Sequence, residues 1–108
     1  ETVDLASMLA TPGVKTPDSD DEFDGLVRLA GRAPVVVDFS AEWCGPCKGI
    51  APVFEQLAAE HPALVFVKVD VDKLRGTAQR FGVKAMPTFH LLRNCASVAN
   101  FQGADPNR

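Results

Sequence analysis

Residues 35–48 read VVVDFSAEWCGPCK and carry the strongest indication of the fold. This stretch begins with three β-branched valines and is apolar through Phe39 except at Asp38, as in a strand buried on both faces of a sheet. Cys44 and Cys47 follow directly, and apolar residues then continue at helical spacing to about Glu60. This stretch therefore predicts a buried strand that leads into a cysteine pair at the start of a helix.

Outward from this stretch, apolar periodicity and turn residues predict the element order βαβαβαββ. The first three strands should be parallel because helical crossovers join them, and the last two should form an antiparallel hairpin. The predicted class is α/β, with a mixed central sheet flanked by helices. The further elements are a strand at 14–16, a helix between the capping residue Ser19 and Gly31, a strand at 64–69, a short helix at 73–81, and strands at 88–92 and 97–101.

A length of 108 residues predicts one domain, which we place at residues 14–108. Residues 1–13 are interpreted as an N-terminal extension. It contains either vector-derived sequence up to Ala6-Ser7-Met8 or a short amphipathic helix that uses Val3, Leu5, Met8 and Leu9. A net charge of −3 does not favour nucleic acid as a partner. No apolar run approaches the roughly 20 residues that span a bilayer, so no membrane partner is expected.

The cysteine count of three is odd, and two of the three form Cys-x-x-Cys. This usage favours a reducing compartment, the cytosol or the nucleus, where a disulfide is transient and catalytic. The alternative interpretation of Cys-x-x-Cys is half of a zinc site. Structural zinc needs about four ligands, and Cys95, His61 and His90 are not paired at ligand spacing. We therefore expect no metal.

The cysteine pair has the spacing that disulfide exchange needs. A thiolate is the attacking species, and a helix start stabilises an anion at Cys44 through its dipole and free amides. Cys47 lies one helical turn further on, within reach of the same sulfur. Gly45 permits the tight turn, and Pro46 suits the first turn of a helix.

Asp38 is unusual because carboxylates are rarely buried without a partner. Burial beneath the cysteines would raise its pKa and allow proton exchange with Cys47, whereas the alternative is a loop cap or a solvent-facing strand end. Lys68 is either its ionic partner or a solvated strand end. The Met86-Pro87 bond precedes a strand and is a candidate cis peptide, although residue type alone does not decide this.

Residues 35–48 resemble the thioredoxin family, and the resemblance extends over residues 14–105. It continues in Ile50-Ala51-Pro52, in KVDVD at 68–72, in MPTF at 86–89 and in Gln102-Gly103-Ala104. The resemblance implies the thioredoxin fold, with Cys44 as nucleophile, Cys47 as resolving thiol, Asp38 as proton acceptor coupled to Lys68, and Pro87 after a cis bond. The implied client-docking residues are Trp43, Gly45, Pro46, Met86, Pro87, Gly103 and Ala104.

The implied activity is reduction of client-protein disulfides, since Gly-Pro between the cysteines resembles the reducing members of the family. No bound cofactor is implied besides the redox-active Cys44–Cys47 disulfide, and NADPH acts only through a separate reductase. One alternative is a recruiting module of a larger protein, with redox chemistry secondary. Segments that include Gly13-Val14-Lys15, Gly76-Thr77-Ala78 and Arg93-Asn94 are also similar to the thioredoxin domain that precedes a proteasome-interacting module in one cytosolic subfamily. An oxidase or isomerase is a second alternative.

Three departures from the family pattern stand out. The chain stops at Arg108 without the family's final amphipathic helix, which is expected to leave one sheet face uncovered. Ser40 replaces a residue that is often aromatic. Cys95 occupies the hairpin turn, where glycine is usual. We therefore expect a monomer, or a weak dimer formed through the uncovered face or through Cys95.

Overall fold

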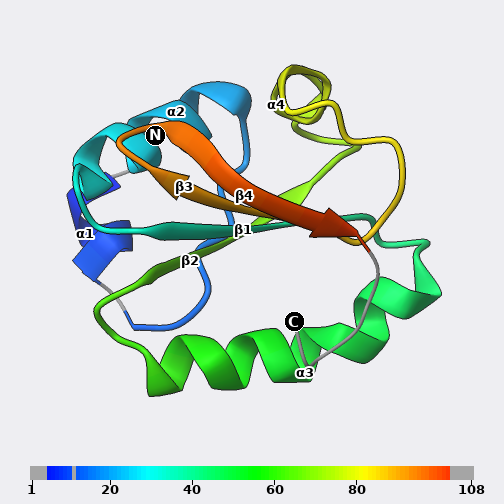
Figure 1. The fold of residues 1–108 in the computed structure, drawn as a ribbon, viewed down its shortest axis with the longest axis horizontal. Coiled ribbons are helices and arrows are strands. Elements are labelled where there is room, and N and C mark those ends of the chain that lie inside the picture. Colours follow the sequence, from blue (N-terminus) through cyan, green and yellow to red (C-terminus); the bar gives the residue numbers. More distant parts are fainter. Residues whose placement is uncertain (1–4, 11, 103–108) are drawn as a thin grey trace.

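The computed structural model describes residues 5–10 and 12–102 as one sheet with helices on both sides (Figure 1). The observed order confirms the predicted α/β class, and most boundaries lie within two residues of those expected. The elements are α1 (Leu5–Ala10), α2 (Asp20–Ala30), β1 (Val35–Ser40), α3 (Gly45–Glu60), β2 (Val65–Asp70), α4 (Arg75–Arg80), β3 (Thr88–Arg93) and β4 (Ala96–Gln102).

The four strands lie in the order β2-β1-β3-β4. Strands β1 and β2 are parallel, whereas β3 is antiparallel to both β1 and β4. The strand predicted at 14–16 is reduced to a single parallel bridge between Lys15 and Val67. The Lys15 N–H donates to the Phe66 carbonyl, and the Lys68 N–H donates to the Lys15 carbonyl. Pro17 has no N–H with which to extend this pairing.

Helices α2 and α4 cover one face of the sheet, and α3 covers the other (Figure 1). Because side chains alternate along a strand, β1 supplies both layers. Its residues Val35, Val37 and Phe39 pack in the cluster that contains Phe23 of α2, whereas Val36 packs with the α3 cluster. Asp38 has the same parity as Val36 and therefore lies on the α3 face.

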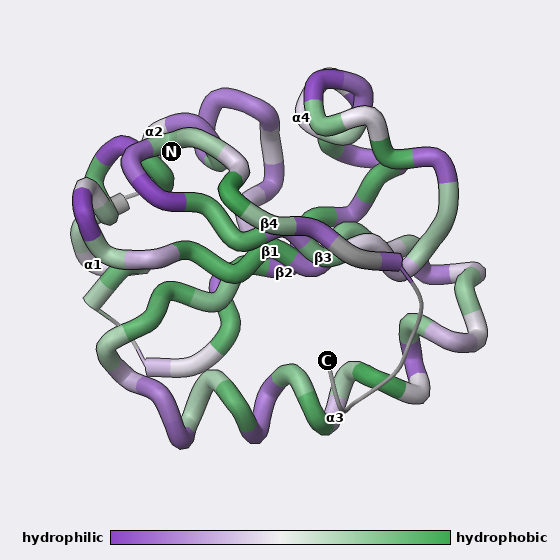
Figure 2. Tube along the Cα trace, viewed as in Figure 1, coloured by the Kyte–Doolittle hydropathy of each residue, from purple (hydrophilic) through white to green (hydrophobic). Residues whose placement is uncertain are grey.

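Hydropathy along the chain follows these layers (Figure 2). The central strands are hydrophobic over much of their length, and α3 alternates between hydrophobic and hydrophilic residues. The buried positions of α3 are Cys47, Ile50, Phe54 and Ala58. An amphipathic helix is thus held against the sheet by one apolar stripe.

Helix α2 begins after the predicted capping residue Ser19 and ends at Gly31. Ser19 Oγ accepts the Glu22 N–H at 3.2 Å, whereas the Glu22 carboxylate accepts the N–H of Asp18, one residue before the cap. Gly31 ends α2 with a φ of +59°, which suits glycine. Pro52 lies inside α3, and Figure 1 shows that this helix changes direction along its length.

Helices α2 and α4 are joined by polar contacts that the sequence did not reveal. Asp20 Oδ1 accepts the Thr77 N–H at 2.8 Å and the Thr77 hydroxyl, and the hydroxyl bond lowers the pKa of the Asp20 carboxyl. A Cβ on Gly76 would lie 2.8 Å from Asp20 Oδ2, so glycine permits this close approach. The acidic first turn of α2 therefore also binds the start of α4.

The β3–β4 hairpin turns through Asn94 and Cys95, which have φ values of +52° and +68°. Two consecutive left-handed residues are the requirement of a type I′ turn, which normally favours Asn-Gly. The expectation that Cys95 occupies a glycine position is therefore confirmed by its backbone.

Helix α1 contacts α2. Val3, which belongs to the amphipathic helix considered for the N-terminus, lies outside the described residues. The division at residues 13 and 14 stays a prediction. Over residues 5–10 and 12–102, no helix has the length and apolar character needed to cross a membrane.

Candidate active site

Cys44 and Cys47 form a disulfide at the N-terminus of α3. Their Cα atoms are 5.3 Å apart, and Cys44 is the N-cap residue of the helix. The Cys47 N–H donates to Cys44 Sγ at 3.2 Å. Pro46 lies in the first turn, where its missing N–H leaves no hydrogen bond unmade. The helix thus supplies a backbone donor directly to the first sulfur.

Both cysteines are largely buried, with Cys44 5% and Cys47 3% exposed. Ala41, Val71 and Met86 pack around them. Cys44 Sγ lies 3.7 Å from the Met86 carbonyl oxygen, and the Met86–Pro87 peptide bond is cis. The segment before β3 is therefore placed directly against the first cysteine.

Asp38 is 1% exposed and lies in the middle of β1. Within the described part of the chain, its Oδ1 has no hydrogen-bond partner. Burial raises the pKa of Asp38 to about 6, and the Lys68 ammonium partly opposes this rise. The alternative of a solvent-facing strand end is wrong for Asp38, because its side chain is 1% exposed and β1 is paired on both sides at this residue.

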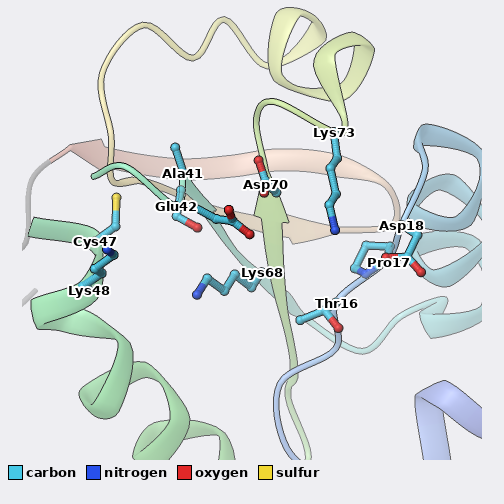
Figure 3. A pocket seen from close by; sticks show the side chains of 11 residues that line it. Thr16, Pro17, Asp18, Ala41, Glu42, Cys47, Lys48, Lys68, Asp70 and Lys73 are labelled. Atoms are coloured by element: carbon cyan, nitrogen blue, oxygen red, sulfur yellow. The ribbon is translucent and has the colours of Figure 1, made fainter. Parts of the chain in front are cut away.

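Lys68 is the direct register partner of Asp38 on β2, so the two side chains share the α3 face of the sheet. Lys68 and Cys47 both line a groove of about 540 Å³ (Figure 3). The figure shows Lys68 extending from β2 toward the side on which Cys47 and Lys48 lie. This groove gives water a route to the surroundings of Cys47. Its charged lining residues are Asp18, Glu42, Asp70, Lys48, Lys68 and Lys73.

Trp43 is 66% exposed beside the cysteines. Its indole Nε1–H donates to Asp72 Oδ2 at 2.9 Å, and the Asp72 N–H donates to Asp70 Oδ1. No role for Asp72 is evident from the sequence, because its partner lies 29 residues away along the chain. The available signal was the indole N–H, which usually finds an acceptor. Asp72 fixes one edge of the exposed ring.

The structure brings together most of the residues predicted for the site. Gly45 and Pro46, which lie between the two cysteines, are exposed like Trp43. Pro87, which follows Met86, is fully buried. Gly103 and Ala104, which were predicted to dock clients, lie outside the described residues. Cys95 forms no disulfide and lies in the β3–β4 turn.

The arrangement is suited to two-electron thiol chemistry. It holds a cysteine pair that can alternate between dithiol and disulfide, a backbone donor to one sulfur, and a buried carboxyl group whose pKa is raised to about 6. Among residues 5–10 and 12–102, no three His, Cys, Asp or Glu side chains gather as a metal site would require.

Known proteins resemble this chain over most of its length. The family model described as Thioredoxin matches residues 14–108. A thioredoxin of Callithrix jacchus is 44% identical over 95 residues, covering 88% of this chain and 90% of the relative. An H-type thioredoxin of Oryza sativa subsp. indica is 46% identical over 78% of this chain and 70% of its own length. The crystal structure of reduced Schistosoma mansoni thioredoxin pre-protein is 40% identical, covers 90% of each chain and superposes with a TM-score of 0.84.

Proposed function

Because this chain belongs to the thioredoxin family of dithiol–disulfide oxidoreductases, we propose that it reduces disulfides of client proteins with Cys44 as nucleophile. The observation that carries the proposal is the position of Cys44 Sγ, which accepts the Cys47 N–H and lies against the Met86 carbonyl. A backbone donor at a helix start stabilises a thiolate. The Met86 main chain offers an edge along which a client segment would lie.

In the proposed reaction, the Cys44 thiolate attacks one sulfur of a client disulfide. A Cys44–client bond forms, the client disulfide breaks, and the second client sulfur leaves as a thiolate that takes a proton from water. Cys47 then loses its proton and attacks Cys44 Sγ. The Cys44–Cys47 disulfide forms, the remaining client sulfur leaves, and the client has gained two electrons.

Asp38 is proposed to accept the proton of Cys47. Its raised pKa, about 6, keeps the carboxylate basic enough to exchange a proton with a thiol near neutral pH. Water in the groove that Cys47 and Lys68 line would carry the proton. Lys68 is proposed to stabilise the ionised carboxylate from the adjacent strand.

The proposed cycle needs an electron donor, electron acceptors and a reducing compartment. An NADPH-dependent thioredoxin reductase would return the Cys44–Cys47 disulfide to the dithiol, and client proteins would accept the electrons. The cytosol or the nucleus suits this cycle, because reducing conditions keep such a disulfide transient. Consumption of NADPH in a mixture of reductase, this protein and a disulfide client would test the whole cycle.

Reduction of insulin disulfides by dithiothreitol tests the central step. The wild-type protein should accelerate the reaction, and Cys44→Ser should be no faster than dithiothreitol alone. Cys95→Ser is the matched control and should retain the wild-type rate. An equal rate for wild type and Cys44→Ser would refute the reductase and leave the recruiting module as the better hypothesis.

Trapping of the intermediate tests the order of the two cysteines. Without the resolving thiol, Cys47→Ser should accumulate a client joined covalently to Cys44, and dithiothreitol should release it. If the covalent intermediate accumulated with Cys44→Ser instead, Cys47 would be the nucleophile and Cys44 the resolving thiol.

A further inference from the structure

A second groove, with a volume of about 510 Å³, lies beside Met86. Its uncharged lining residues are the apolar Val71, Ala78, Val83 and Met86 and the polar Gln79. Val71 and Met86 also pack against the buried cysteines, so the groove lies next to the cysteine pair. In Figure 1, the segment after α4 descends to the end of the sheet at which α3 begins.

The charged residues that line this groove are both cations. Arg75 opens α4, and Lys84 lies in the segment between α4 and the Met86–Pro87 bond. Both side chains are exposed. Asp72, whose carboxylate accepts the Trp43 indole N–H, is not among the residues that line this groove. The groove that contains Lys68, in contrast, is lined by three acidic and three basic residues.

This local charge is opposite to that of the chain, whose net charge is −3. At long range, an acidic client is therefore not attracted to the molecule as a whole. A preference for acidic clients has to arise within the groove, where a carboxylate would meet Arg75 and Lys84 without a competing acidic lining residue.

We propose that Arg75 and Lys84 determine client specificity, by selecting client segments that carry Asp or Glu close to the disulfide cysteine. This inference rests on the proposed reductase function. Val71 and Met86 line the groove and also contact the cysteines, and an extended segment advances about 3.3 Å per residue. The acidic residue is therefore expected within a few residues of the client cysteine, next to an apolar residue that contacts the groove.

Short peptides with a cysteine joined by a disulfide to thionitrobenzoate test the proposal. The peptides carry Asp, Asn or Lys two residues before or two residues after the cysteine and are otherwise identical. The reduced protein is mixed with each peptide, and release of thionitrobenzoate gives the second-order rate constant. At low salt, the Asp peptide should react about three- to tenfold faster than the Lys peptide in at least one of the two positions, as two partly exposed ion pairs allow. This ratio of rate constants should fall at high salt, because salt screens the ion pairs.

The double variant Arg75→Glu/Lys84→Glu should invert the ratio of Asp to Lys rates. Glutamate suits the first turn of α4, so this variant should fold. The matched control is Arg32→Glu/Arg93→Glu, which changes the net charge equally. Arg32 and Arg93 are exposed at the end of the sheet remote from the cysteines. The control variant should therefore keep the wild-type ratio of Asp to Lys rates.

Two results would overturn the inference while the reductase function stands: equal rates for the Asp and Lys peptides with wild type, or an unchanged ratio in the Arg75/Lys84 variant. An inverted ratio in the control variant would also overturn it, because net charge would then explain the preference. If the wild-type protein reduces none of the peptides, both the inference and the proposed function fall.

Discussion

At the residue scale, Asp38 opposes folding at neutral pH. Its side chain is buried, one carboxylate oxygen lacks a partner in the described part of the chain, and its pKa is raised to about 6. An acid whose pKa is higher in the folded protein stabilises that state below its ordinary pKa, and this contribution disappears as the pH rises through the folded value. Ionised Asp38 therefore lowers the stability of the folded protein. The proposed proton transfer gives a reason for an acid at this buried position.

Asp38→Asn should remove this dependence on pH. The difference between about 6 and the ordinary value of 3.8 corresponds to about 3 kcal/mol. Between pH 4 and pH 7, the free energy of unfolding of the oxidised wild type should therefore fall by up to this amount relative to the variant. Urea unfolding of both proteins across this range measures the difference.

The same variant should reduce insulin more slowly at neutral pH, because Cys47 loses its proton acceptor. Identical pH profiles of stability for the two proteins would show that Asp38 does not titrate in this range. An unchanged rate of reduction would remove Asp38 from the proposed proton transfer.

At the scale of elements, the β3–β4 turn places Cys95 at a φ of +68°, a conformation that side chains with a Cβ adopt at a cost. Cys95→Gly should raise the free energy of unfolding by about 0.5–1 kcal/mol in urea unfolding under reducing conditions. Cys95→Ala is the matched control, since it removes the thiol and keeps the Cβ. A similar gain from both variants would assign the effect to the thiol and not to the backbone.

The contact between α2 and α4 depends on Asp20, whose carboxylate accepts two hydrogen bonds from Thr77. Asp20→Ala should cost about 1 kcal/mol at pH 7, as loss of a helix-capping side chain does. Since these bonds lower the pKa of Asp20, the stabilisation is present above its ordinary value of 3.8 and disappears as the pH falls through the folded value.

Chemical unfolding of Asp20→Ala and Asp21→Ala separates this contact from general helix electrostatics. Asp21 is exposed in the same first turn of α2 and carries the same charge. The Asp21 variant should lose markedly less stability at pH 7. Equal losses would mean that charge at the helix N-terminus, and not the contact with Thr77, accounts for the effect.

At the scale of the molecule, the active-site helix is held to the sheet by an aromatic cluster. Phe54 of α3 packs edge-on against Phe66 of β2, with ring centroids 5.3 Å apart, and lies 6.0 Å from Phe89 of β3. These contacts fix α3, and with it Cys44 and Cys47, relative to Asp38 and the Met86 segment. The positions of the site residues therefore depend on packing between the layers.

Phe54→Ala should lower the free energy of unfolding by about 3–5 kcal/mol, because it leaves a cavity between α3 and the sheet. Leu29→Ala on the exposed side of α2 serves as the control and should change it by less than about 0.5 kcal/mol. Thermal and urea unfolding measure both. A loss below 1 kcal/mol for Phe54→Ala would show that the cluster does not secure α3.

Much of the site could be predicted from local sequence. Trp43, Cys44 and Cys47 are contiguous with a strand and a helix whose periodicities are clear, so their placement at a helix start followed from short-range rules. Asp38 was expected to be buried for the same reason. The expected oligomeric state and the roles of Gly103 and Ala104 stay predictions.

The sequence by itself determined the order of the elements and the chemistry of the cysteine pair, because backbone propensity, apolar periodicity and two-residue spacing are local properties. Only the tertiary structure shows that Asp20 binds Thr77 and that Trp43 binds Asp72, and it places Arg75 and Lys84 in one groove beside Met86. For Asp38 and Lys68, which the sequence offered as possible partners, it supplies the register that sets them side by side on β1 and β2. Each pairing joins segments whose separation along the chain carries no local signal. The register of the strands and the packing of α4 bring them together.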